Sequence, residues 1–173
     1  GPLRLRDARA RQAQAAVEYV AAELRELGLD VKLEKVMVPH WVRGEETAAL
    51  TDYPSMVEST TQKVVVTALG GSVPTPKDGL SAEVVVVNNF DELQALGRDR
   101  VAGKIVLFNE KFDQQLADKG FAGPAYGQSV IYSGIGARAA ARLGAVGALT
   151  RSDGCPYHRM LHTGALRHAH AEP

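Results

Sequence analysis

Four short runs of apolar, mostly β-branched residues constrain the fold of this chain more than any other feature. They cover residues 64–69, 84–87, 105–108 and 146–149, with turn-forming residues nearby. Such runs lack the apolar-polar alternation of a strand with one wet face, and they are too short for a typical helix. The pattern predicts four strands, the first two buried on both faces and the last interrupted by Gly147.

The longest periodic segment lies near the start of the chain, from residue 10 to residue 27. Its apolar residues follow helical spacing and would form one stripe: Ala13, Val17, Val20, Leu24 and Leu27. Gly28 then offers a left-handed C-terminal cap. Residues 31–38 are expected to form a strand that Pro39 ends, and an irregular connection through Trp41 and Gly44 should follow.

Two further helices and a long loop are expected among the later strands. Asn89 is a suitable cap for a short helix over 91–96, and an alanine-rich helix over 137–143 should end at Gly144. Residues 109–133 show little periodicity and are rich in glycine, which predicts a loop. Loops of this length are often functional, so this segment is expected to reach toward a cleft or partner. The fold is predicted to be mixed α/β.

Composition excludes several classes of protein. The chain has 173 residues, 45% of them hydrophobic, and its 20 Lys and Arg balance 20 Asp and Glu, so no global field favours nucleic acid. A short arginine run near the start is better explained as a solvated helix face than as a nucleic-acid site. No window is apolar enough for a membrane span. The single cysteine, Cys155, leaves the compartment open. The chain does not start with methionine, which suggests a processed product or a piece of a longer chain.

Two segments in this order resemble the protease-associated domain, a module found in many peptidases. The first, residues 101–108, is a turn with a glycine that leads into a buried strand. The second, residues 139–149, is a helix of small residues that leads through Gly-Ala into another strand. Flanking sequences narrow the resemblance to the carboxypeptidase Q (plasma glutamate carboxypeptidase) type of di-zinc exopeptidase. These sequences lie at residues 28–31, 36–46, 68–76 and 162–164.

The resemblance implies a division of the chain near Asp52. Residues 1–52 would supply a helix and strand of a catalytic α/β domain, and residues 53–173 would form an inserted protease-associated domain of the swivelling β/β/α type. In the family this domain lies over the active-site cleft and can take part in dimer contacts. The implied partners are the remainder of the catalytic domain, short peptides and a second copy of the protein. Family members are commonly exported, which implies a secreted or periplasmic location if a leader has been lost.

The resemblance also implies that the complete enzyme holds two zinc ions, whereas this chain lacks the family's ligand motifs. The chain contains none of the expected His-x-Asp and bridging Asp segments, and no zinc ligand or catalytic residue is carried over. Glu45 and Glu46 match the type of a base-plus-ligand pair, but they precede the insertion instead of following it. With Arg43 beside them, a solvated or locally paired acidic turn is the preferred interpretation.

The tail contains the one metal-like constellation, formed by Cys155, His158 and His162, with His168 and His170 beyond it. Surface histidines in an irregular tail are the preferred interpretation, because four converging ligands and a tight knuckle are not evident. A nucleophile and base made from Ser152 or Cys155 with His158 is disfavoured, since sequence proximity does not create geometry.

Three other features have a structural and a functional interpretation. The Gly70–Ser72 segment could suggest a phosphate loop, but the prolines after it favour a simple turn. Trp41 is expected to be a packing anchor, and Tyr126 a loop aromatic that could contact a ligand or partner. As a whole, the chain is expected to be a non-catalytic portion of a zinc exopeptidase. The alternatives are an autonomous protein-interaction module and a truncated, inactive peptidase homologue.

Overall fold

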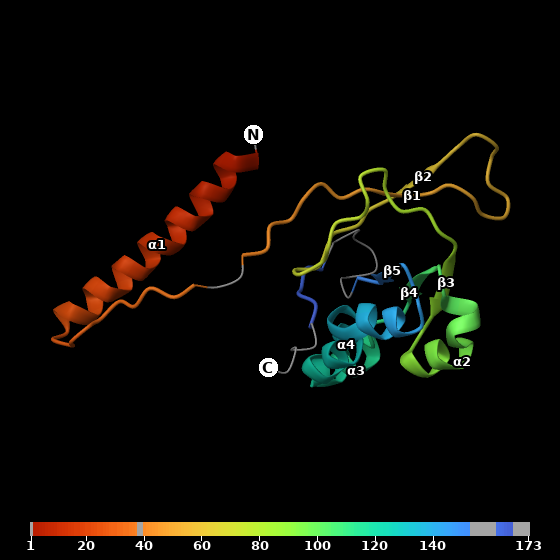
Figure 1. Cartoon of the computed structure of the whole chain (residues 1–173). Helices are drawn as coiled ribbons and strands as arrows, with labels where there is room; N and C mark the ends of the chain where they lie inside the picture. Colours follow the sequence, from red (N-terminus) through yellow and green to blue (C-terminus); the bar gives the residue numbers. More distant parts are fainter. Residues whose placement is uncertain (1, 38–39, 153–161, 168–173) are drawn as a thin grey trace. The chain divides into compact units, whose positions relative to one another are not determined.

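The computed structural model describes residues 2–37, 40–152 and 162–167, and it divides the chain into two compact units, Gly1–His40 and Trp41–Pro173. Figure 1 shows the elements of both units along the chain. The second unit begins before Asp52, where the boundary was predicted. The assignment of residues 1–52 to a catalytic domain and of residues 53–173 to an inserted domain stays a prediction.

The first unit consists of α1 (Pro2–Glu26) and an extended segment that follows it. The predicted helix is therefore confirmed, and Gly28 adopts the left-handed conformation of the predicted cap, with φ of 81°. The predicted strand at 31–38 is wrong, because residues 31–37 form no strand in the described structure. A strand needs a hydrogen-bonded neighbour, and this segment instead lies along α1, where Val31 and Leu33 line a groove of about 360 Å³.

The second unit is built on a three-stranded parallel sheet with the order β3-β4-β5. Its strands are β3 (Val84–Val87), β4 (Ile105–Phe108) and β5 (Gly147–Thr150). The first two coincide with predicted strands, and the third is shifted by one residue from the prediction. Val84 pairs with Ile105, and Ile105 pairs with Gly147, so the three strands start in register.

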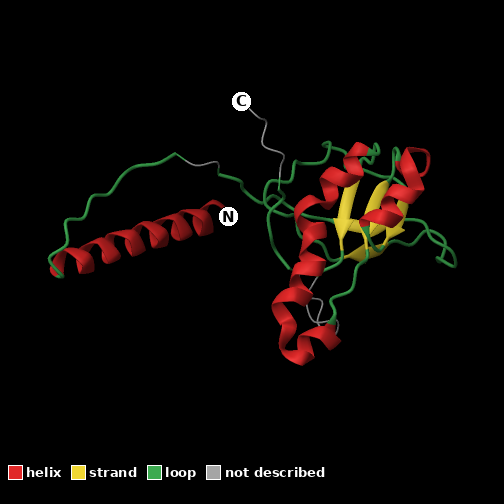
Figure 2. Ribbon diagram, turned by 90° about the horizontal axis from the view of Figure 1, so that it is seen from below, coloured by secondary structure: helices red, strands yellow, loops and turns green. Residues whose placement is uncertain are grey.

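The helices α2 (Phe90–Val101) and α4 (Ala122–Arg142) connect these strands and pack on the sheet (Figure 2). The predicted short helix is thus longer than 91–96, and Asn89 caps it as predicted, since its side chain accepts a hydrogen bond from the Glu92 amide. The core between helices and sheet is small and aliphatic apart from one ring. Its buried members are Val87, Leu93, Val101, Val106, Phe108 and Ala140.

One face of the sheet stays partly exposed. Val84 and Val86 of β3 are 36% and 56% exposed, so the predicted burial of this strand on both faces is wrong. Consecutive parallel strands are joined by right-handed crossovers, which place successive helices on the same side of the sheet when the strand order is sequential. The β3-β4-β5 order therefore covers only the face that carries Val87, Val106 and Phe108.

The predicted loop at 109–133 is wrong over most of its length, because this stretch is largely helical. It contains α3 (Gln114–Leu116), the π-helical turn η1 (Ala117–Phe121) and the first half of α4. The predicted helix at 137–143 is only the end of α4. Gly120 adopts the left-handed conformation, with φ of 90°, where the chain turns before α4. Pro124 lies in the first turn of α4, where the missing amide hydrogen costs little.

A small antiparallel pair completes the unit. Its strands are β1 (Ala48–Leu50) and β2 (Gln62–Val64). The predicted strand at 64–69 is therefore wrong beyond Val64, because the following residues are engaged by side chains of the segment at 41–46 and not by a ladder. The irregular connection predicted through Trp41 and Gly44 is confirmed. No helix among the residues that the structure describes is long and apolar enough to cross a membrane.

Candidate functional site

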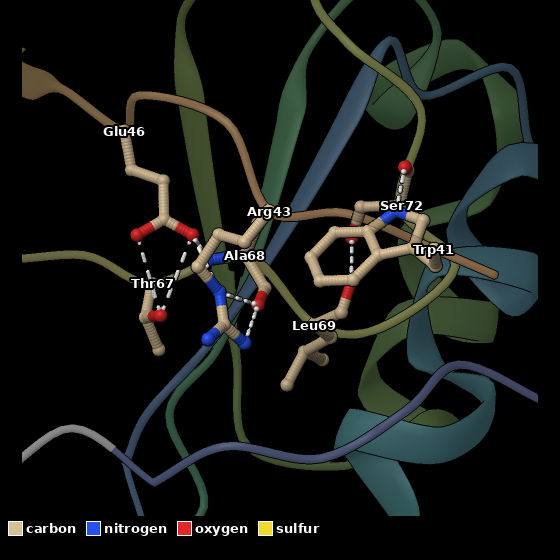
Figure 3. Close-up of polar contacts among 7 residues, drawn as sticks. All are labelled: Trp41, Arg43, Glu46, Thr67, Ala68, Leu69 and Ser72. Carbon is tan, nitrogen blue, oxygen red and sulfur yellow. Dashed lines mark hydrogen bonds and ion pairs between the residues drawn. The ribbon is translucent and has the colours of Figure 1, made fainter. Parts of the chain in front are cut away.

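The segment Trp41–Glu46, here called the entering segment, carries the first polar cluster. Arg43 Nε lies 2.9 Å from Glu46 Oε1, so of the predicted solvated or locally paired turn, local pairing is confirmed for Glu46. The same guanidinium donates two hydrogen bonds, of 2.8 and 3.2 Å, to the carbonyl oxygen of Ala68 (Figure 3). Planar bidentate donation of this kind fixes orientation as well as distance.

The Glu46 carboxylate is engaged as an acceptor on several sides. Besides the ion pair with Arg43, it accepts a hydrogen bond of 2.6 Å from the Ala68 amide, and the Thr67 hydroxyl lies 3.4 Å from both of its oxygens. Oε1 carries both short contacts, and Oε2 has the longer Thr67 contact, so donors of the chain itself fix the position of this carboxylate. Its geometry suits a structural acceptor, and it is not that of a general base facing a substrate.

Trp41 is the anchor that its residue type predicted. Its indole N–H donates to the Ser72 carbonyl at 2.9 Å, and the Arg43 guanidinium lies 5.4 Å from its ring (Figure 3). Around Ser72 the chain forms the predicted turn, in which the amide and hydroxyl of Ser72 both donate to Leu69 O. The Gly70 amide is already bonded to Gly164 O at 2.7 Å. Amides engaged in this way are not free to cradle a phosphate.

A second polar contact joins two residues that the sequence singled out separately. The Tyr126 hydroxyl and His162 Nε2 lie 2.8 Å apart, and their rings meet edge to face. The His162 amide also donates to Ser152 Oγ at 3.2 Å. Tyr126 and His162 are 36 positions apart, so no local sequence pattern indicated their contact. Tyr126 lies on the first turns of α4 and not on a loop, and its ring is partly exposed.

The metal-like constellation of the tail, for which surface histidines were the preferred interpretation, lies mostly outside the described residues. Cys155 and His158 fall there, as do His168 and His170, so neither interpretation is tested at these positions. Of its members, His162 alone is described, and its ring nitrogen is bonded to Tyr126. Within residues 2–37, 40–152 and 162–167, no group of three His, Cys, Asp or Glu side chains could hold a metal ion. The described part of the chain does not provide a zinc site.

Other polar groups gather where the parallel strands end. Arg151 donates from its guanidinium to Asn109 Oδ1 at 3.3 Å, just beyond β5 and β4. Asn88, just beyond β3, donates to Glu92 from its backbone amide and its side chain, and these bonds lower the pKa of Glu92. Burial, together with nearby carboxylates, raises the pKa of Tyr132 in α4. These contacts cap helices and strands and do not form a nucleophile-and-base pair.

No family model matches the chain, but curated and solved proteins do. It is 42% identical over 140 residues to carboxypeptidase Q of Xenopus laevis, which covers 80% of this chain and 26% of the relative. Carboxypeptidase Q of Mus musculus is 34% identical over 161 residues, or 92% of this chain and 30% of the relative. The chain thus spans between a quarter and a third of the carboxypeptidase Q sequences that it matches.

A solved structure gives the same result in three dimensions. The crystal structure of a peptidase M28 precursor from Shewanella amazonensis SB2B matches with a TM-score of 0.73 and 37% sequence identity, covering 92% of this chain and 34% of that one. At this identity and coverage the likeness extends beyond the general α/β architecture. The chain is therefore carboxypeptidase Q-like, and it corresponds to one portion of an M28 peptidase.

Proposed function

We propose that this chain is the non-catalytic N-terminal and protease-associated portion of a zinc-dependent exopeptidase that acts on dipeptides or short peptides. The observation that carries the proposal is the match of nearly the whole chain to only a part of carboxypeptidase Q and of an M28 peptidase. Three described groups add support, because Asp113 caps α3, Glu46 is paired with Arg43, and the His162 ring contacts Tyr126. In the complete enzyme two zinc ions would supply the activated water.

In this proposal, α1 belongs to the catalytic domain, and the second unit works as the protease-associated domain. The apolar groove between α1 and the segment after it fits this role, since its lining would be buried by the rest of a catalytic domain: Ala16, Val17, Val20, Ala21, Leu24, Val31 and Leu33. The second unit would lie over the active site and contact substrate or a partner, including a second copy. A secreted or periplasmic location belongs to the same proposal.

The helical tip formed by α3, η1 and the start of α4 is the best candidate for contact with substrate. It carries the partly exposed rings of Phe121 and Tyr126, and a π-turn such as η1 is often found at functional sites. In the complete enzyme, Tyr126→Phe should shift the KM ratio between longer peptides and dipeptides, while Tyr19→Phe on α1 should not. Equal ratios in the wild type and both variants would exclude a substrate contact made by the Tyr126 hydroxyl.

Dipeptide hydrolysis tests the non-catalytic assignment. The purified chain, with and without added zinc, should give no turnover under conditions in which full-length carboxypeptidase Q is active. Zinc-dependent hydrolysis by the chain alone would refute the assignment. The reading frame that encodes the chain supplies the second check. If the proposal is right, it should continue beyond Pro173 into His-x-Asp and Glu-Glu segments.

An autonomous protein-interaction module is the second candidate. The exposed aliphatic face of the sheet favours it, since Val84, Val86 and Leu149 are each at least a third exposed. A stop codon directly after Pro173 would favour this candidate, or a truncated and inactive peptidase homologue, over the peptidase portion.

A further inference from the structure

The two ends of the second unit meet on one short piece of chain. Residues Thr67–Ser72, here called the clasp, receive the entering segment on one side. On the other side they receive residues His162–Arg167, here called the returning segment. Neither segment belongs to a regular sheet, and all three are separated widely in sequence. Their meeting is therefore a tertiary feature that the helices and strands do not explain.

The entering segment binds the clasp through side chains. Glu46 accepts from the Ala68 amide at 2.6 Å, Arg43 donates to the Ala68 carbonyl at 2.8 Å, and Trp41 donates to the Ser72 carbonyl at 2.9 Å (Figure 3). Two of these three bonds involve a charged group, which makes them stronger than neutral ones. Both backbone groups of Ala68 are thus satisfied by one ion pair.

The returning segment binds the clasp through its backbone. The Gly70 amide donates to Gly164 O at 2.7 Å, the Leu166 amide donates to Gly70 O at 2.8 Å, and Gly70 and Ala165 form a parallel bridge. A Cβ at Gly70 would lie 3.4 Å from both Ala165 Cβ and Gly164 O. A Cβ would thus just fit against the returning segment, whereas the additional methyl groups of a larger side chain would press on Ala165.

Two contacts with α4 hold the returning segment from its other side. His162 is bonded to Tyr126 near the start of the helix, and the Arg167 amide donates to Gly134 O at 2.7 Å. The stem of Arg167 passes over Gly134, where a Cβ would come within 3.6 Å of it. The returning segment is thus fixed between α4 and the clasp.

We infer that the clasp holds the entering segment and the returning segment together, so that the two ends of the second unit form one short connection, here called the neck. Glu46 is the residue that positions the clasp in this neck. Because Ala68 and Gly70 lie two residues apart, loss of the Glu46 contact should loosen the bridge to the returning segment as well. Where further chain follows residue 173, as the proposed function has it, a unit held in this way is linked to that chain and to residues 1–40 by a single short neck and not by two independent linkers. This inference goes beyond the proposed function and holds whether or not the second unit covers an active site.

Amide hydrogen exchange on the full chain tests the coupling. Glu46→Gln removes the charge that binds Ala68, and it should raise exchange about tenfold at Gly70 and Leu166, two amides that Glu46 does not contact. Glu83→Gln is the matched control, because it breaks an ion pair with Lys104 in the same unit but away from the clasp. In the control, exchange at Gly70 and Leu166 should not change.

The reverse experiment begins at Gly70, where the clasp contacts the returning segment. Gly70→Val should push Ala165 away, and it should raise exchange at Ala68, whose partner lies on the entering segment. The core amide of Asn109, bonded to Val87 O, reports whether each variant is folded. If Glu46→Gln unfolds the core, Trp41→Phe replaces it, since it removes the indole donor to Ser72 O together with part of the ring and leaves the Glu46–Ala68 hydrogen bond in place. The inference would be overturned if Glu46→Gln left exchange at Gly70 and Leu166 unchanged, or if Gly70→Val left exchange at Ala68 unchanged, while the Asn109 amide stays protected.

Discussion

At the scale of single residues, Gly136 shows how tightly α4 meets the sheet. A Cβ at this position would lie 2.8 Å from Cε2 of Phe108, the largest fully buried side chain. Since Phe108 also contacts Phe90 and Tyr132, it has little room to move. Gly136→Ala should therefore lower the free energy of unfolding by about 1–3 kcal/mol, as overpacking does.

Gly127 is the matched control for this substitution, because it lies in the same helix and a Cβ at its position would meet no other atom within 4 Å. Gly127→Ala should raise the free energy of unfolding by about 0.5–1 kcal/mol, since alanine loses less backbone entropy in a helix. Urea unfolding of both variants provides the measurement. Changes of the same sign would contradict the packing argument.

The candidate site shows which residue-scale features a sequence can indicate. The Arg43–Glu46 pair was predictable because the partners are three residues apart, and the turn at Gly70–Ser72 was predictable from its composition. The Tyr126–His162 contact was not, because it depends on where α4 and the returning segment lie in space. Both residues were candidates, but nothing in the sequence placed them together.

At the scale of elements, the same distinction explains the helix that was predicted as a loop. Residues buried on α4 do follow helical spacing, but they are small: Ala125, Ser129, Ser133, Gly136 and Ala140. A search for large apolar residues does not detect such a stripe, and the glycines before it suggest irregular structure. The strands at 84–87 and 105–108 were predictable because β-branched and apolar runs of that length have few alternatives.

The start of α2 gives a prediction of pH dependence. Hydrogen bonds from Asn88 lower the pKa of Glu92 in the folded chain below its ordinary value. A carboxylate with a lowered folded pKa stabilises the fold above its unfolded pKa, and this contribution disappears as the pH falls through the folded pKa. Between neutral pH and pH values below the ordinary carboxyl range, the wild type should therefore lose more stability than Glu92→Gln.

Urea midpoints at several pH values measure this difference. Asp99→Asn removes another exposed carboxylate of α2 and should leave the pH profile close to that of the wild type. Parallel profiles for the wild type and Glu92→Gln would show that the Asn88 contacts do not contribute to the pH dependence.

At the scale of the whole molecule, the two units differ in how much apolar surface they bury. In the second unit the sheet and helices enclose a core of six buried residues around Phe108. In the first unit, Ala21 is the one buried hydrophobic residue among those whose burial is described, and Val17, Val20 and Leu27 of the apolar stripe are about half or more exposed. A helix that buries so little apolar surface gains little stability from tertiary packing.

The first unit should therefore unfold locally well before the second. Amides in the middle of α1 should exchange at least about a hundredfold faster than amides of β4, since they lack the packing that protects the sheet. Limited proteolysis should cut within residues 12–37 and leave a product that retains the second unit.

If the proposed function is right, adding the separately produced remainder of the longer protein should slow amide exchange in the residues that line the α1 groove, without affecting exchange in β4. Equal protection of α1 and β4 in the chain alone would mean that α1 is already covered, and the groove would then not mark a missing partner.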